Sequence, residues 1–161
     1  MPETDRLSNY IDVLVEKAQS WQDFGEQILE ILRSDDQGKL LEVVDRRETI
    51  IKAYIDCLQR CTDELHRRGL VFQAESVFPF LLELSGSDPV YSCFQGRLIK
   101  LRNVLENTRS QESEVLDQAT RLPQQLRGQL LKVQTQKAGI QAYQKNRSMA
   151  YAGFSRFERK K

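Results

Sequence analysis

Apolar side chains recur at alternating spacings of three and four residues over most of the chain. This spacing places them on one stripe of a helix. Near the N-terminus the pattern predicts a helix over about residues 4–33. The positions of this stripe are Leu7, Ile11, Leu14, Ala18, Trp21, Gly25, Ile28 and Leu32.

A second helix is predicted over about residues 39–68, after a polar break at 34–38. Its stripe consists of Leu40, Val44, Arg47, Ile51, Tyr54, Leu58, Cys61 and Leu65. Further apolar residues flank the stripe on both sides, which indicates burial against more than one neighbour. Because the break is short, we expect the first two helices to form an antiparallel hairpin.

The remaining helices are predicted over about 76–85, 89–122 and 123–144. Asp88 can cap and Pro89 can start the long one. The stripe then keeps its phase through Pro123, which either kinks a continuous helix or starts a new one. Its positions are Phe94, Leu98, Leu101, Leu105, Thr108, Glu112, Val115, Ala119, Leu122, Leu126, Gln129, Val133, Gln136, Ile140 and Tyr143.

A straight helix from Pro89 to Tyr143 would be about 80 Å long and would overhang the first two helices. The part after Pro123 therefore either packs as a fourth helix or projects with its apolar stripe uncovered, as a partner site. We expect an all-α fold, an antiparallel helical hairpin plus a long kinked third helix. It is a three- to four-helix, coiled-coil-like bundle forming one domain over 1–147, with a basic, flexible tail at 148–161.

Six positions interrupt the stripes, among them Gln129 and Gln136 near the C-terminal end of the last one. Gly25 indicates a close helix–helix contact or, alternatively, a hinge. For Arg47 we expect a packed stem whose head reaches Glu48 or a carboxylate on another helix, with a direct functional role as the alternative. Thr108 and Glu112 weaken the stripe of the long helix.

Composition narrows the class of protein. Of the 161 residues, 40% are apolar and 29% are charged, and the net charge is +1. Such a balance gives no field that would steer nucleic acid or an acidic membrane to the chain. The apolar runs are too short for membrane insertion, and the first residues lack the apolar core of a signal peptide. Three cysteines form no disulfide framework, so we expect a reduced, cytoplasmic setting.

The candidate chemistry is sparse. His66 is the only histidine, which excludes a di-iron bundle and leaves no basis for a catalytic triad. Cys57 and Cys61 lie one helical turn apart and, with Cys93 and His66, make four nominal zinc ligands. Their spacing is not that of a zinc site, so packing is favoured over metal binding or redox sensing. We expect no enzyme, no catalytic residue, no metal and no cofactor.

The C-terminal residues combine basic and aromatic side chains, including Lys145, Arg147, Tyr151, Phe154 and Phe157. Such a segment is typical of single-stranded nucleic acid binding, of a short docking motif, or of a solvated terminus. The near-neutral net charge disfavours nucleic acid.

Three segments carry a resemblance to a known family. They are the start of the second helix, Leu40-Leu41-Glu42-Val43-Val44-Asp45-Arg46-Arg47-Glu48-Thr49-Ile50-Ile51, the long-helix segment Leu101-Arg102-Asn103-Val104-Leu105-Glu106-Asn107, and the Tyr-containing basic ending from Ala142 to Lys161. In these segments and in its layout the chain resembles the flagellar type III export chaperones of the FlgN/FliT type.

The resemblance implies a cytoplasmic chaperone that binds a hook–filament junction or filament cap protein. It would keep that export substrate from aggregating or polymerising and deliver it to the export gate or ATPase. We expect a partner groove formed by Leu122, Leu126, Leu130, Val133 and Ile140, with Tyr143 and Tyr151 docking to the export machinery. The alternative is a structural bundle that acts as a homodimer without a client.

Overall fold

The computed structural model describes residues 3–34, 38–73 and 76–122. Within these ranges the chain forms helices and no strand, so the predicted all-α class is confirmed. The elements are α1 (Glu3–Arg33), α2 (Leu40–Arg67), α3 (Val77–Ser87), the 3₁₀ turn η2 (Ser92–Phe94) and α4 (Gln95–Thr120). The expected helix over 123–144, the bend at Pro123 and the tail lie outside the described residues.

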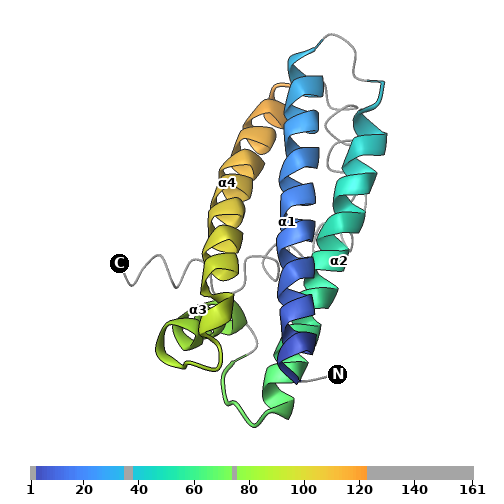
Figure 1. Ribbon diagram of the computed structural model, residues 1–161. Coiled ribbons are helices and arrows are strands. Elements are labelled where there is room, and N and C mark those ends of the chain that lie inside the picture. The colour runs from blue at the N-terminus through green and yellow to red at the C-terminus, as the bar shows by residue number, and fades with distance from the viewer. Residues whose placement is uncertain (1–2, 35–37, 74–75, 123–161) are drawn as a thin grey trace.

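Helix α1 lies between α2 and α4 (Figure 1). It runs antiparallel to α2 and parallel to α4, and α3 lies at the lower end of the bundle. Extensive packing joins α1 to both α2 and α4, whereas direct contact between α2 and α4 is sparse. Among the described helices, α2 and α4 therefore share a side that α1 does not cover.

The predicted stripes form the core. Every stripe position of α1 and α2 is buried, including Gly25 and Arg47. On α4 the stripe positions up to Ala119 are buried except Glu112, which is intermediate. The alternation of three and four thus identified the inward faces of all three long helices.

The start of α4 differs from the prediction. The helix begins at Gln95 and not at Pro89, because the carboxylate of Asp88 accepts a hydrogen bond from the backbone N–H of Val90 at 2.9 Å. That bond closes a turn, and the chain then passes through η2 before α4 begins. The side chain of Asp88 therefore caps this turn and not the N-terminus of α4.

The buried apolar side chains fall into two groups. We call the larger group, nearer the N-terminus of α1, the lower cluster. The upper cluster lies where α1 ends, α2 begins and α4 ends, and consists of Ile28, Leu29, Leu32, Leu40, Val43, Val44, Val115 and Ala119. Between the two groups the buried residues are Gly25 on α1, Arg47 on α2, and Thr108 and Gln111 on α4.

Candidate functional site

A polar layer separates the two apolar clusters. We define it as Arg47 of α2 and Thr108, Gln111 and Glu112 of α4, and Trp21 of the lower cluster borders it. The indole Nε1 of Trp21 donates to Oε1 of Glu112 at 3.1 Å. Nη1 of Arg47 lies 3.5 Å from the same carboxylate oxygen. One carboxylate therefore links all three long helices.

Arg47 is the most deeply buried charge in this layer, with 1% of its surface exposed. Besides Glu112, it has an ionic neighbour in Glu48, whose Oε1 lies 3.9 Å from Nη2. The expectation that its head reaches Glu48 or a carboxylate on another helix is confirmed for both. Within the described residues, however, none of its three guanidinium nitrogens has a hydrogen-bond partner. Buried donors without such partners are costly, so this arginine is incompletely satisfied.

Gln111 closes the layer on the α1 side. Its amide Nε2 donates to the backbone oxygen of Gln22 at 3.0 Å and to Oε1 of Glu26 at 2.9 Å. Gly25 lies directly beneath this amide, and a Cβ added there would overlap it. Gly25 therefore marks a close helix contact, as expected. Thr108 is satisfied within α4, since its hydroxyl donates to the oxygen of Val104 at 2.8 Å.

Sequence reasoning treated Thr108 and Glu112 as weakening the stripe and passed over Gln111. The structure shows instead that all three have partners within the bundle. Gln111 lies off the stripe, so apolar spacing could not reveal it. The one available signal was Gly25, which required a contact partner on another helix.

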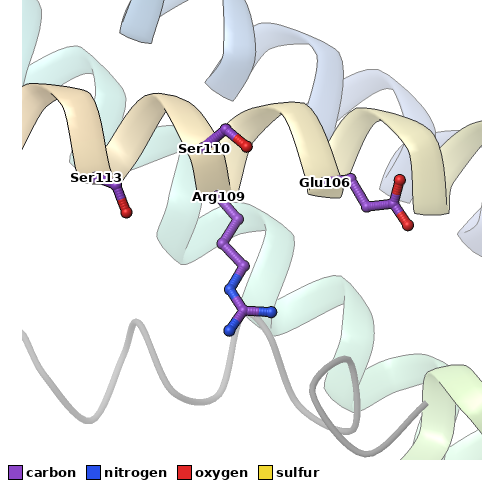
Figure 2. A pocket seen from close by; sticks show the side chains of 4 residues that line it. All are labelled: Glu106, Arg109, Ser110 and Ser113. Carbon is purple, nitrogen blue, oxygen red and sulfur yellow. The ribbon is translucent and has the colours of Figure 1, made fainter. Parts of the chain in front are cut away.

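A hollow lies alongside α4. Glu106, Arg109, Ser110 and Ser113 line it, and all four belong to successive turns of this helix (Figure 2). The side chain of Leu116, three residues beyond Ser113, is 46% exposed.

Of the predicted partner-site residues, the structure describes Leu122 alone. It is half-buried and packs against the upper cluster. The rest of that site, comprising Leu126, Leu130, Val133, Ile140, Tyr143 and Tyr151, lies outside the described residues.

Cys57 and Cys61 are buried between α2 and α1, and Cys93 is exposed. The thiol of Cys57 donates to the backbone oxygen of Tyr10 at 3.2 Å. A hydrogen bond from Cys61 lowers the pKa of Cys57, helped by the charges of Arg60 and Lys17. The same hydrogen bond, together with burial, raises the pKa of Cys61 well above its usual range. This placement agrees with a packing role for the pair.

His66 is exposed at the end of α2. Its ring stacks on Phe72 at 4.4 Å between centroids, and its Nε2 lies 3.2 Å from the Phe72 backbone oxygen. In the part of the chain that the structure describes, no three His, Cys, Asp or Glu side chains gather as metal ligands would. No helix within these ranges has the length and apolar character to cross a membrane.

A buried carboxylate at the lower end was also missed. Glu64 lies off the stripe and is 5% exposed. Its oxygens lie 2.7 Å from Arg67, 3.4 Å from Arg68 and 3.7 Å from Arg6 of α1. The hydrogen bond from Arg67 and the three positive charges hold the pKa of this carboxyl below its usual range. The cluster fastens the start of α1 to the end of α2.

Comparison of the chain with protein-family models, with curated proteins and with solved structures finds no match.

Proposed function

We propose that this protein is a non-enzymatic chaperone of flagellar type III export. Its client would be a terminal segment of a hook–filament junction or filament cap protein. The family resemblance of the sequence motivates this proposal. One structural observation supports it: Leu122, where the predicted partner stripe begins, packs against the apolar upper cluster. The predicted binding stripe therefore starts from an apolar end of the bundle.

Binding of an amphipathic client helix would need no catalytic group. The client would lay its apolar stripe against an apolar face of the chaperone and so hide the surface through which it aggregates. Among the described helices, α1 leaves one side of α2 and α4 uncovered, and this is the side against which we place the client helix. The client is protected because binding removes its free form by mass action.

Delivery to the export gate or ATPase is the second half of the proposal. Tyr143 and Tyr151 are the residues we assign to that contact, because an aromatic ring with a hydroxyl combines apolar area with a hydrogen bond. Their substitution should leave client binding unchanged and weaken docking to the export machinery.

The test is light scattering coupled to size-exclusion chromatography. The full chain is run alone and then with C-terminal segments of flagellar junction and cap proteins. We expect a stoichiometric complex. A Leu126→Glu/Val133→Glu variant should lose it, because two charges would enter the apolar contact.

The matched control is Gln124→Glu/Gln134→Glu, which adds the same charge away from the stripe and should bind as the parent does. If the parent forms a stable homodimer that ignores every client segment, the chaperone proposal is wrong and the structural-bundle alternative is favoured. Equal binding by the two double variants would leave the chaperone role but remove the site from this stripe.

A further inference from the structure

The outer side of α1 carries a row of polar, mostly acidic side chains. Their spacings alternate between four and three residues, so they share one stripe of the helix, about 27 Å long. We call this stripe the acidic face, and it consists of Asp12, Glu16, Gln19, Asp23, Glu26 and Glu30. All five carboxylates are exposed. The acidic face is therefore open to a ligand without any rearrangement of the bundle.

Few cations balance the acidic face. Within the described residues, Asp12 is the one carboxylate of the five that pairs with a cation, at 2.7 Å from Nη1 of Arg97. Glu26 accepts a hydrogen bond from the neutral amide of Gln111 at 2.9 Å. Like charges one turn apart on a helix repel each other. The acidic face thus carries surplus negative charge that a basic ligand would relieve.

The charge of the whole chain is divided unevenly. Residues 1–122 contain 22 Asp and Glu but 15 Lys and Arg, whereas residues 123–161 contain nine Lys and Arg but one acidic residue. The net charge of +1 therefore combines an acidic part of −7 with a basic part of +8. The acidic part would repel a polyanion that approached the basic part. This charge complementarity favours contact between the two parts of the chain.

The end of α4 brings the basic part close to α1. Leu122 packs against the upper cluster, to which Leu29 and Leu32 of α1 belong, and Glu30 of the acidic face lies between these two in the sequence. We call residues 145–161 the basic segment; it lies outside the described residues and contains six Lys and Arg. Seventeen extended residues can span about 55 Å, which is more than the acidic face requires. Attachment to the same chain also gives the segment a high effective concentration at α1.

We propose that the acidic face of α1 binds the basic segment of the same chain. The lysine and arginine head groups pair with the carboxylates of α1 that lack a cation. Each exposed ion pair is weak and is screened by salt, so the contact depends on several pairs together and opens as the ionic strength rises. A more acidic partner would compete with α1 for the segment and release it. The inference is independent of the proposed chaperone function, because it concerns the protein alone.

Limited proteolysis of the full chain by chymotrypsin tests the contact. This protease cuts after aromatic residues, and the basic segment contains Tyr151, Phe154 and Phe157, so cleavage does not depend on the charged residues themselves. Early cleavage at these three sites is followed by intact-mass spectrometry, and a synthetic peptide of residues 145–161 gives the unprotected rate. In about 0.05 M NaCl we expect cleavage of the chain to be about fivefold slower than that of the peptide, and in about 0.5 M NaCl the two rates should converge.

Substitutions in α1 locate the binding site and leave the sequence of the basic segment unchanged. Glu16→Gln/Asp23→Asn/Glu30→Gln should raise the low-salt cleavage rate about fivefold, to that of the peptide, and should remove its salt dependence relative to the peptide. Because all three side chains are exposed, the thermal unfolding midpoint should stay close to that of the parent.

The matched control removes three exposed carboxylates from α2 and α3, as Asp56→Asn/Asp63→Asn/Glu83→Gln. It changes the net charge by the same amount and should be cut as slowly as the parent. Four results would overturn the inference. Cleavage of the parent at the rate of the peptide in low salt would show that the segment is not bound. Equal loss of protection in both triple variants would show that the acidic face is not the site.

The remaining two results concern the occupant. Protection that increases with protein concentration would assign the contact to a second copy instead of the same chain. Protection that appears only after a single-stranded oligonucleotide is added would show that the basic segment binds nucleic acid and not α1.

Discussion

The lower and upper clusters are built by the same three helices but differ in kind. The lower cluster contains buried aromatic rings, among them Trp21, Tyr54 and Phe94, and is covered at its end by α3. The upper cluster is small and its buried members are aliphatic, with Phe24 half-buried at its edge. Aromatic rings bury more area per residue, so the lower cluster contributes most of the stability.

The difference suggests that the lower cluster stabilises the fold and that the upper cluster is the end suited to binding. A small aliphatic end, set off by a polar layer, opens at lower free energy than a large aromatic core, and binding elements are drawn from such low-stability regions. The upper cluster is also the end at which Leu122 packs.

The largest effect is expected at the boundary. Trp21 is fully buried, forms an edge-to-face pair with Tyr54 at 6.0 Å, and donates to Glu112. Trp21→Ala should cost about 3–5 kcal/mol in the free energy of unfolding. Denaturant titration followed by circular dichroism measures this loss. Trp21→Phe, which keeps most of the volume, should cost clearly less, and an equal cost would contradict the packing explanation.

Two isoleucines compare the clusters directly. Ile11 and Ile28 are both fully buried, one in each cluster. We expect Ile11→Ala to lower the free energy of unfolding by about 4 kcal/mol and Ile28→Ala by about 2 kcal/mol. The smaller upper cluster, at the end of the bundle, can collapse around a cavity more readily than the lower cluster. The same denaturant titration applies. Equal costs would show that the two clusters form one cooperative unit.

Gly25 tests the polar layer. Gly25→Ala should cost about 1 kcal/mol, since displacing the Gln111 amide loses two hydrogen bonds while the helix gains propensity. In a protein that already carries Gln111→Ala, Gly25→Ala should instead raise the free energy of unfolding, by about 1 kcal/mol. Thermal or denaturant unfolding of the four proteins measures both values. A Gly25→Ala cost that persists without Gln111 would argue against this contact.

Lowering the pH should reduce the stability contributed by the lower end of the bundle. Because the folded pKa of Glu64 is depressed, its contribution to stability is present above the unfolded pKa, about 4.3 for a glutamate. That contribution is lost progressively as the pH falls below this value towards the folded pKa. Unfolding midpoints measured across this range should fall less steeply in Glu64→Gln than in the parent. The exposed neighbour variant Asp63→Asn should keep the slope of the parent.

The sequence could predict the fold because apolar spacing determines which faces are buried. Every position of the stripes through α1 and α2 is buried, although further buried residues, such as Leu29 and Glu64, lie off the stripes. Arg47 and Gly25 could be interpreted correctly because each is an exception within a regular apolar stripe. A buried charge needs a carboxylate nearby, and a glycine on the stripe indicates a close contact with another helix. The start of α4 could not be predicted from Pro89, since the side chain of Asp88 closes a turn instead of a helix.

The site could be predicted only in part. Gln111 and Glu64 lie off the stripes, and their roles depend on residues 85 or more positions away and on three arginines from two helices. No one-dimensional spacing encodes such contacts. Among the predicted partner-site residues Leu122 alone lies in the described part, and its packing does not test partner binding, so the whole site stays a prediction.

The parallel course of α1 and α4 has a consequence for the direction of a bound helix. Of the described helices, α1 and α4 end and α2 begins at the upper end (Figure 1), so the dipoles of these three helices leave about half a negative charge there and the opposite at the lower end. Arg33, in the last turn of α1, offsets part of this charge. A fourth helix would cancel the remainder only by entering with its N-terminus at the upper end. We therefore expect a client to lie antiparallel to α1 and α4, completing an alternating set of four helix dipoles.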